Sequence, residues 1–394
     1  MNLYRECAIC NNKNGNLLYE QKFILPDEYK GLPEKYNIVE CTCCGLVYND
    51  MKASQAVYDS YYAKNSNYYE RNFVNQNLPS SVARITEKDI IRFENVLDDV
   101  SVFINHESQI LDIGCANGGF LYVLKSNGYR NVVGIDMSEE CLSNAKGLDI
   151  ECHKAGCFTM PDTFENKFDL VVLSHVLEHI YDVDIAIKNI SRVMKDGGVL
   201  YIESPDSSRY YDFYNKPFYF FDLEHINHFN EQSLINLAGK HGFTVEVSNE
   251  KKAGNGYPSV SIIFKKNNSP HLNVLSDNSK LKKYIEKSHE NDIVDKIREL
   301  IISQEEVIAW GVGNIALSLL GKGLNECNIV AVVDSDIKKQ GITFSALNGL
   351  KVENPEVIKN FKGATIVILA AYYHEEISKQ IKDMDTSNRI KSIF

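Results

Sequence analysis

The sequence contains no long apolar run. None of its hydrophobic segments approaches the ~20 residues that a membrane-spanning helix needs. Its first ten residues, MNLYRECAIC, also lack the basic and then apolar layout of a signal peptide. Together these absences predict a cytoplasmic protein with no membrane partner, in which cysteines are expected to stay reduced.

An excess of basic residues is missing as well. The chain has 42 Lys and Arg against 53 Asp and Glu, and a formal net charge of −11 at pH 7. This balance disfavours nucleic acid or an anionic membrane surface as the main partner. No fixed-period repeat or low-complexity tract is present. With 394 residues, 44% of them hydrophobic, the chain can bury sizeable cores in two or three domains.

Strand-like and helical patterns divide the chain into five segments. We predict an N-terminal module at 1–50, a Tyr-rich arm at 51–79, a main α/β domain at 80–265, a polar linker at 266–280 and a C-terminal α/β domain at 281–394. In both α/β domains, alternation of strands and helices predicts a doubly wound sheet made largely of parallel strands. Residues 281–303 are expected to form one amphipathic helix.

Half of the cysteines lie in the first 50 residues, and four of them form two pairs. Cys7-x-x-Cys10 and Cys41-x-x-Cys44 have the spacing of metal ligands, and four thiolates make a closed tetrahedral Zn²⁺ site. Because such a site has no open position, the zinc is predicted to be structural. The alternative is a set of free surface thiols, with Cys43 a bystander in either case. Five other cysteines show no ligand spacing and are expected in the core or lining a pocket: Cys115, Cys141, Cys152, Cys157 and Cys327.

A glycine-rich turn follows an apolar strand in QILDIGCANGGFLYVLKSNGY, residues 109–129. Such a turn allows a ligand to approach the backbone next to a helix N-terminus. The next strand ends at Asp136, 22 residues past Gly114, where an acid can accept hydrogen bonds from ribose hydroxyls. Alone, this pattern could also open a dinucleotide fold. Here it is followed by KFDLVVLSHVLEHI, DIAIKNISRVMKDGGVLYIESPD and two strands, FTVEVSN and SVSIIFK, that are close enough to pair as a hairpin.

As a set, LDIGCANGGF, GIDMS, FDLVVLSHVLEHI and ISRVMKDGGVLYIESPD resemble the class I methyltransferases that depend on S-adenosylmethionine (SAM). The resemblance covers about residues 80–265 and implies a seven-stranded Rossmann-like sheet with SAM as cofactor. It also implies positions for nine residues. Asp112, Gly114 and Ala116 would face the methionine portion, Asp136 the ribose, Met137, Cys157 and Phe158 the adenine, and Ser174 and His175 the sulfur. Ala116 departs from the family, in which a glycine is usual.

The tetrapeptide Leu-Glu-His-Ile occurs twice, around His179 and around His225. The first copy follows a buried strand, at the end where parallel strands place their ligands. The second lies in an aromatic-rich stretch, 207–234, just before a predicted helix. We therefore expect two imidazoles that reach one pocket from opposite walls, and not a repeat. For His179, a supporting or helix-capping role is as reasonable as direct catalysis.

The overall order of segments resembles the zinc-containing sugar C-methyltransferases, which act on nucleotide-linked keto sugars and belong with surface-polysaccharide biosynthesis. By this resemblance the acceptor is a nucleotide-linked sugar, and Tyr62 and Tyr69 of the arm would close over it. That family has Tyr-x-Glu-His where this chain has Asp222-Leu223-Glu224-His225. The match predicts His225 as general base and Glu224 as the residue that orients it. From its place in the facing loop, His179 is expected to contact the acceptor. The missing tyrosine leaves C-, O- and N-methylation open.

Other classes of function stay open beside this one. Gly311-x-Gly313-x-x-Ala316, with Asp334 21 residues past Gly313, is a fair dinucleotide fingerprint and would suit an NAD-dependent oxidoreductase. The family resemblance instead implies a Rossmann-like module that holds the nucleotide end of the substrate. A methyltransferase acting on a non-sugar acceptor, a nucleic-acid methyltransferase and a non-catalytic cofactor-binding protein are further alternatives. The acidic balance disfavours nucleic acid, and the set of acids and histidines disfavours loss of catalysis.

Overall fold

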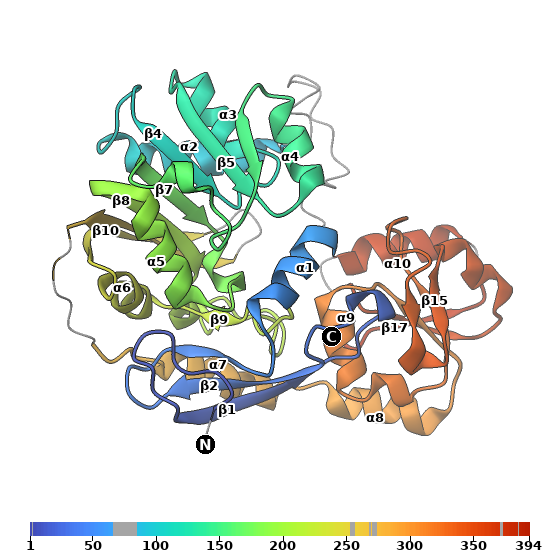
Figure 1. The fold of residues 1–394 in the computed structure, drawn as a ribbon. Coiled ribbons are helices and arrows are strands. Elements are labelled where there is room, and N and C mark those ends of the chain that lie inside the picture. Colours follow the sequence, from blue (N-terminus) through green and yellow to red (C-terminus); the bar gives the residue numbers. More distant parts are fainter. Residues whose placement is uncertain are drawn as a thin grey trace. The chain divides into compact units, whose positions relative to one another are not determined.

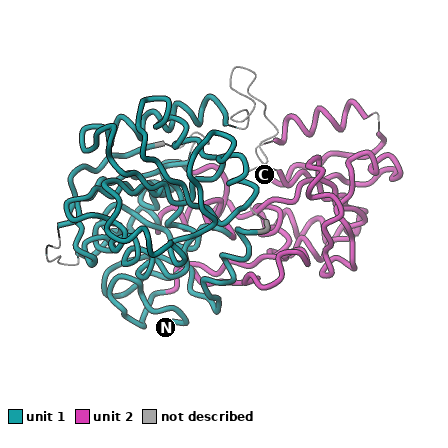
Figure 2. Tube along the Cα trace, turned by 45° about the horizontal axis from the view of Figure 1, so that its top comes forward, with its two compact units in different colours: residues 1–16, 39–213, 224–281 teal, residues 17–38, 214–223, 282–394 magenta. Residues whose placement is uncertain are grey.

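The computed structural model describes residues 1, 3–65, 85–252, 257–267, 269, 274–370, 373–384 and 386–394. They form two compact units that interleave along the chain (Figure 2). Unit 1 comprises residues 1–16, 39–213 and 224–281, and unit 2 comprises 17–38, 214–223 and 282–394. The five-segment division predicted from the sequence remains a prediction. Part of the Tyr-rich arm, with Tyr69, lies outside the described residues.

A seven-stranded sheet forms the centre of unit 1 (Figure 1), as predicted. Its strands are β4 (Gln109–Ile113), β5 (Asn131–Asp136), β6 (Glu151–Lys154), β7 (Phe168–Ser174), β8 (Met194–Pro205), β10 (Phe243–Lys252) and β11 (Pro258–Lys266). The order is β10-β11-β8-β7-β4-β5-β6. Strands β4 to β8 pair in parallel, and β10 and β11 form the predicted antiparallel hairpin. The strand order reverses between β4 and β7, which is where such sheets bind ligands.

Helices cover both faces of this sheet (Figure 1). Buried residues of α2 (Glu87–Ser101), α3 (Gly119–Ser126) and α4 (Glu139–Lys146) share one core cluster with Ile110 of β4. Residues of α5 (Val183–Val193) and α6 (Glu231–Gly239) share another with Leu111. Neighbouring residues of β4 thus point to opposite faces, as the pleat requires, and Asp112 and the turn after β4 come to the sheet edge between the two layers.

A second sheet, of order β1-β2-β3-β9, includes the N-terminal strands. These are β1 (Gly15–Lys22), β2 (Lys35–Cys41), β3 (Val47–Asp50) and β9 (Asn227–His228), and α1 (Gln55–Asn65) follows β3. In unit 1, β3 pairs antiparallel with β9, so Tyr48 lies opposite Asn227. The short strand β9 begins two residues after His225, and its pairing with β3 ties the second Leu-Glu-His-Ile copy to the N-terminal segment.

The buried guanidinium of Arg5 strengthens that connection. It donates hydrogen bonds to the carbonyl oxygens of Asn49 and Tyr181, at 2.9 and 2.5 Å, and to the Asn227 side chain at 3.3 Å. It also lies over the ring of Tyr181, 4.2 Å from the centroid. Only 7% of Arg5 is exposed, so one side chain holds together three segments that are distant in sequence.

Unit 2 contains a six-stranded sheet of order β14-β15-β13-β12-β16-β17. Its strands are β12 (Val307–Trp310), β13 (Ile329–Val333), β14 (Thr343–Phe344), β15 (Leu350–Glu353), β16 (Thr365–Ile368) and β17 (Arg389–Lys391). Its helices include α8 (Val294–Ser303), α9 (Asn314–Gly321) and α10 (His374–Asp383), and α7 (Ser279–Glu290) leads into it. The predicted glycine turn lies between β12 and α9, where the Asp334 carboxylate accepts the Val312 N–H at 2.8 Å.

The prediction of one helix over 281–303 is wrong, because α7 ends at Glu290 and α8 begins at Val294. The break falls on Asn291 and Asp292, whose side chains compete for backbone hydrogen bonds and disfavour a helix interior. Asp292 accepts the N–H of Ile293 at 2.8 Å.

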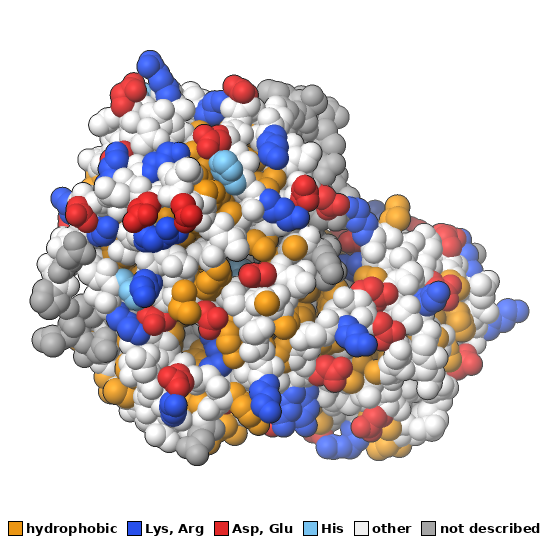
Figure 3. All heavy atoms as spheres, in the orientation of Figure 1, with side chains coloured by type: hydrophobic (Ala, Val, Ile, Leu, Met, Phe, Trp, Pro, Cys, Tyr) orange, Lys and Arg blue, Asp and Glu red, His pale blue; other side chains and the backbone are white. Residues whose placement is uncertain are grey.

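Single turns of 3₁₀ helix complete the described elements: Asp27–Tyr29, Asp162–Phe164, Leu177–His179, Ser207–Arg209, Leu324–Glu326, Ser345–Leu347 and, slightly longer, Pro355–Asn360. Among the helices that the structure describes, none is both long enough and apolar enough to cross a bilayer. On the face drawn in Figure 3, basic and acidic side chains are interspersed.

Candidate active site

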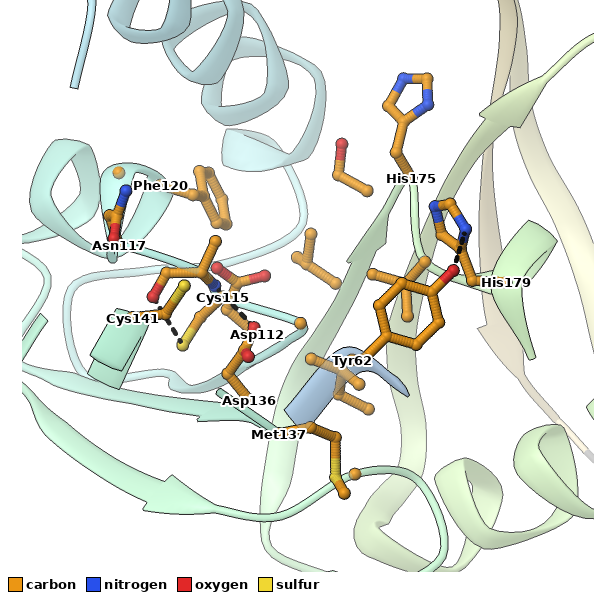
Figure 4. Close-up of a pocket in the computed structure, with 18 of the residues that line it drawn as sticks. Tyr62, Asp112, Cys115, Asn117, Phe120, Asp136, Met137, Cys141, His175 and His179 are labelled. Carbon is orange, nitrogen blue, oxygen red and sulfur yellow. Dashed lines mark hydrogen bonds between the residues drawn. The ribbon is translucent and has the colours of Figure 1, made fainter. Parts of the chain in front are cut away.

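A cavity of about 250 Å³ opens in unit 1 at the carboxyl ends of β4, β5 and β7. All nine residues that the family resemblance assigned to the cofactor line it: Asp112, Gly114, Ala116, Asp136, Met137, Cys157, Phe158, Ser174 and His175. Asp112 and Asp136 lie on one side of the space, and His175 and His179 lie on the other (Figure 4). The sheet therefore brings the predicted binding residues together, whereas their individual roles remain predictions.

The glycine turn adopts left-handed backbone at two of these positions. Gly114 has φ +73°, and a Cβ atom there would come within 2.6 Å of Val176. Ala116 has φ +45°, a conformation that costs about 1 kcal/mol for a residue with a side chain, which explains why a glycine is usual there. The Asp136 carboxylate accepts the N–H of Ala116 at 3.0 Å and that of Ser138 at 2.8 Å. The acid at the end of β5 thus holds the turn after β4 in place.

Asp112 and Asp136 titrate abnormally because they are buried close together. Burial, and then the negative charge of Asp136, raises the pKa of Asp112 to about 8, although Arg92 acts in the opposite direction. Burial also raises the pKa of Asp136, against the hydrogen bonds that it accepts from Ser138 and Ala116. Asp112 is therefore protonated at neutral pH when no ligand is bound, and a cationic ligand group beside it would favour its ionised form.

Two buried glutamates that the sequence reasoning missed flank His175. Its Nδ1 lies 3.2 Å from Glu178, and its Nε2 lies 3.3 Å from Glu203. Burial alone would lower the pKa of His175, but the charges and hydrogen bonds of Glu203 and Glu178 raise it to about 9. Despite burial, His175 lowers the pKa of Glu178 to about 2 and, with Arg92, holds that of Glu203 well below its usual range. The cavity wall thus contains a protonated imidazole between two ionised carboxylates.

The same network fixes the end of β7. Ser174 lies opposite Glu203 in the parallel β7–β8 register and donates a hydrogen bond to it at 2.8 Å. Arg92 donates to the Ser174 hydroxyl and lies 3.6 Å from Glu203. A sequence signal for this network existed. Each glutamate stands at or near the end of a strongly apolar run, in VLEHI and in YIESPD, where a charged side chain needs buried partners.

The two Leu-Glu-His-Ile copies lie against each other, and not on opposite walls of the cavity as expected from the sequence. The His179 and His225 ring centroids are 4.8 Å apart. The backbone N–H of Ile226 donates to the Glu178 carbonyl at 2.9 Å, and Nδ1 of His179 lies 3.1 Å from the Glu224 carbonyl oxygen. His179 lines the cavity, whereas Glu224 and His225 are not among its described lining residues. The second copy therefore lies behind His179 as seen from the cavity.

Helix α1 contributes neighbouring tyrosines to this pair of segments. The Tyr61 hydroxyl donates to the Glu224 carboxylate at 2.8 Å. The Tyr62 hydroxyl lies 2.8 Å from Nδ1 of His179 and lines the cavity (Figure 4). Tyr62 therefore lies at the cavity, and its closure over an acceptor stays a prediction. The contact of Tyr61 with Glu224 was not predicted.

His225 and His228 differ in their surroundings. Burial lowers the pKa of His225, against the raising effect of Glu178 and Glu224, so its imidazole is neutral and can accept a proton. Burial also lowers the pKa of His228, to about 3. That ring lies in β9 with its Nε2 3.1 Å from the Asn49 side-chain oxygen, which suits a structural role.

The four paired cysteines converge in a separate cluster. Their sulfur atoms all lie within 4.8 Å of one another, with Cys7–Cys44 at 3.4 Å and Cys10–Cys41 at 3.5 Å. Tetrahedral Zn–S bonds of about 2.3 Å would place sulfurs somewhat under 4 Å apart, so the cluster fits a zinc ion. The exposed Cys43 contributes its backbone N–H to the Cys41 sulfur at 3.4 Å. Cys115, Cys141 and Cys157 line the cavity, within their expected range of positions.

The strand order and the lined cavity define an α/β protein of the class I methyltransferase type. Comparison with known families agrees, because residues 87–247 match a model described as Methyltransferase domain. The chain therefore contains a SAM-dependent methyltransferase domain. Residues 303–391 match a second model, described as C2185-like, N-terminal.

Curated relatives are similar over part of the chain. The ubiquinone biosynthesis O-methyltransferase of Bartonella quintana is 30% identical over 132 residues, which cover 32% of this chain and 52% of that protein. The enzyme of the same name from Pelagibacter ubique is 30% identical over 119 residues, covering 28% and 48%. The chain thus spans about half the length of the curated relatives that it matches.

Solved structures with similarity include a SAM-dependent methyltransferase of Methanosarcina mazei. It has a TM-score of 0.39 at 22% identity, covering 43% of this chain and 98% of that one. A possible histamine N-methyltransferase of Thermotoga maritima gives 0.37 at 21% identity, covering 45% and 91%. Likenesses of this size say nothing about the acceptor.

Proposed function

We propose that the protein transfers a methyl group from SAM to a small acceptor bound beside His179. The cavity is the observation that carries this proposal, because it joins the acidic glycine-turn wall to the imidazole wall within one space. Bound SAM supplies an electrophilic methyl group on its sulfonium centre. The residues of the chain then have to align the acceptor with that methyl and take one proton from it.

Each wall supports a separate part of the task. In this proposal Asp136, which accepts two backbone N–H groups, accepts hydrogen bonds from the ribose hydroxyls, and Asp112, which lines the same cavity, faces the methionine ammonium. On the other wall, His179 contacts the acceptor, and His225 is the base that takes its proton. We assign the orientation of the second histidine segment to Glu224, whose carboxylate accepts the Tyr61 hydroxyl at 2.8 Å.

Because His225 lies behind His179 as seen from the cavity, it can act as base only if the acceptor proton has a path to its ring. The ring centroids are 4.8 Å apart, so a proton taken through His179 or through one water molecule reaches His225 without a large movement. The His179 ring is held by the Glu224 carbonyl oxygen, 3.1 Å from its Nδ1, so the first part of this path has a fixed geometry.

For the acceptor we propose a nucleotide-linked sugar or a surface-polysaccharide precursor. The four-cysteine cluster at the N-terminus and the second α/β unit, in the order seen in sugar C-methyltransferases, support this choice. The loss of the family tyrosine at Asp222 favours a hydroxyl over a carbon as the methylated atom. A non-sugar hydroxyl acceptor is the second candidate, favoured by the names of the two O-methyltransferase relatives.

We also propose a structural Zn²⁺ at Cys7, Cys10, Cys41 and Cys44, in a module of residues 1–50 that precedes the methyltransferase domain at 80–265.

The alternative of an NAD-dependent oxidoreductase rests on the glycine turn between β12 and α9. Calorimetric titration of the protein with NAD tests this alternative, since binding at micromolar concentration would support the oxidoreductase over the methyltransferase.

The test of the main proposal is a mass-spectrometric screen with SAM and two acceptor panels, nucleotide-linked sugars and phenolic compounds. A gain of one methyl in either panel identifies the acceptor class. His225→Ala should then lose about 10²–10⁴-fold in turnover, with SAM affinity unchanged by calorimetry. His153→Ala is the matched control, because His153 is half-buried, pairs with Glu151 and is not among the residues that line the cavity. Near-normal turnover of His225→Ala would move the base to His179.

A further inference from the structure

The pair of histidine segments contains a second group of metal-ligating atoms. Glu178, His179 and His225 each offer one ligand atom, and these atoms lie within 4.8 Å of one another. We propose that these three residues bind a divalent transition-metal ion, and that the ion competes with the acceptor proton for the imidazole of His225. Metal binding itself is independent of the proposed function, whereas the competition rests on it.

The distances suit such an ion. Nε2 of His179 lies 4.0 Å from the Glu178 carboxylate, less than twice an ordinary metal–ligand bond of about 2.1 Å. All three ligand atoms lie within 4.8 Å of one another, so small side-chain movements bring them to bonding distance of one ion. Two imidazoles and one carboxylate form the ligand set that binds Fe²⁺ and related ions and leaves other coordination positions open.

The orientation of His179 is the strongest argument. Its Nδ1 faces the Glu224 carbonyl oxygen at 3.1 Å and the Tyr62 hydroxyl at 2.8 Å, and its Nε2 is the nitrogen near Glu178. Metal-binding histidines use their second ring nitrogen in this way, because a hydrogen bond to a carbonyl or similar group fixes the ring and its tautomer. Glu178 is fully buried, so its carboxylate is held in place.

The charges around Glu178 allow a different explanation for its burial beside two imidazoles, and the experiment has to distinguish that explanation from metal binding. His175 lies 3.2 Å from the same Glu178 oxygen, and Ser204 donates to the other oxygen at 3.1 Å. On this view, the carboxylate is present only to pair with His175, and the nearby imidazoles bind no ion. A metal ion would have to share Glu178 with a cationic His175, whose other side faces Glu203.

Cobalt(II) titration distinguishes this site from the four-cysteine cluster. Cobalt bound to thiolates shows a thiolate-to-metal charge-transfer band, and cobalt bound to imidazole and carboxylate does not. The protein, as isolated, is titrated with Co²⁺ by calorimetry and absorption together. We expect one equivalent of Co²⁺ per protein molecule to bind without the charge-transfer band. The affinity for this Co²⁺ should fall about 100-fold or more in His179→Ala and in His225→Ala.

Three variants make the result decisive. His153→Ala, which removes a histidine–carboxylate pair elsewhere, should still bind this equivalent of Co²⁺. Tyr62→Phe removes only the hydroxyl beside Nδ1 and should weaken binding about 10-fold. His179→Asn serves if His179→Ala does not fold, as judged by circular dichroism. The proposed site would be refuted if the wild type bound no such equivalent of Co²⁺, or if the His179 variant bound Co²⁺ with the affinity of the wild type.

Methyltransferase activity provides a second test, which concerns the competition for His225. Once an acceptor is known, Co²⁺ or Zn²⁺ at concentrations that fill the site should inhibit methyl transfer, and excess acceptor should not restore it at fixed metal and pH. Full activity with the site filled would refute the competition while leaving the site. A protein that binds the metal but methylates neither acceptor panel would instead count against the proposed function.

Discussion

The abnormal pKa of Asp112 predicts that SAM binding releases a proton. With a pKa of about 8, roughly 0.9 of the Asp112 carboxyls carry a proton at pH 7, against almost none at its ordinary pKa of about 3.9. Pairing with the methionine ammonium favours the ionised form, so binding should expel nearly the whole of that proton. The affinity should rise up to about tenfold per pH unit below pH 8 and then level off.

The assay is calorimetry in two buffers that differ in ionisation enthalpy. The difference between the apparent enthalpies gives the number of protons released, expected to fall from about 0.9 at pH 7 to about 0.1 at pH 9. Asp112→Asn should abolish the buffer dependence and weaken binding about 10- to 100-fold, since a hydrogen bond to a charged group contributes roughly 1.5–3 kcal/mol.

Asp169→Asn is the control, because Asp169 pairs with Lys195 at 2.8 Å and does not line the cavity. A wild-type protein that releases no proton at pH 7, or an Asp112→Asn protein that still releases one, would refute the reasoning.

Three further predictions concern stability. Arg5→Met leaves three acceptors, one of them partly buried, without their donor and should lower the free energy of unfolding in urea by about 3–5 kcal/mol. Arg5→Lys should lie in between, and a loss below about 1 kcal/mol would contradict the role of Arg5. Because Glu203 and Glu178 raise the pKa of His175 to about 9 against burial, its stabilising contribution is fully present below pH ~6.5 and is lost as the pH rises through ~9. The free energy of unfolding should therefore fall by up to about 3 kcal/mol over that range, and the fall should be smaller in His175→Gln. Protein purified without added zinc should contain close to one equivalent by metal analysis, and chelation should lower its melting temperature; well under one equivalent would count against the four-cysteine site.

The core of unit 1 could be predicted from the sequence because its signals are local. Strand β4, the turn at Gly114 and helix α3 follow one another within about twenty residues, and each has its own pattern. The acid at Asp136 then follows from the next strand in parallel register. Since a parallel sheet places the ends of its strands at one edge, a short list of residues in sequence order was enough to assemble one cavity.

Other features depend on contacts between distant segments and could not be predicted. The pairing of Ser174 with Glu203 follows from the β7–β8 register. The contacts of Arg5 depend on segments more than 170 residues away. The interleaving of the two units depends on which segments pack together, and composition does not reveal this. The helix break at Asn291 was local, and there the regular apolar spacing outweighed two weak helix formers in the prediction.

The two Leu-Glu-His-Ile copies show why an identical tetrapeptide does not imply an identical role. In the first copy, a 3₁₀ turn after β7 buries the Glu178 side chain completely and turns His179 toward the cavity. In the second, the chain approaches β9, and the Glu224 carboxylate meets the Tyr61 hydroxyl. The contacts between the copies are correspondingly unequal: the Glu178 carbonyl accepts a backbone N–H, whereas the Glu224 carbonyl faces an imidazole. The first copy therefore supplies a buried charge and a cavity wall, and the second supplies the carbonyl that fixes His179 and the neutral ring behind it. The separate substitutions Glu178→Gln and Glu224→Gln should reveal this inequality. Loss of the Glu178 charge removes a partner of His175 and should lower the free energy of unfolding, whereas loss of the Glu224 charge leaves its backbone carbonyl in place and should lower turnover alone.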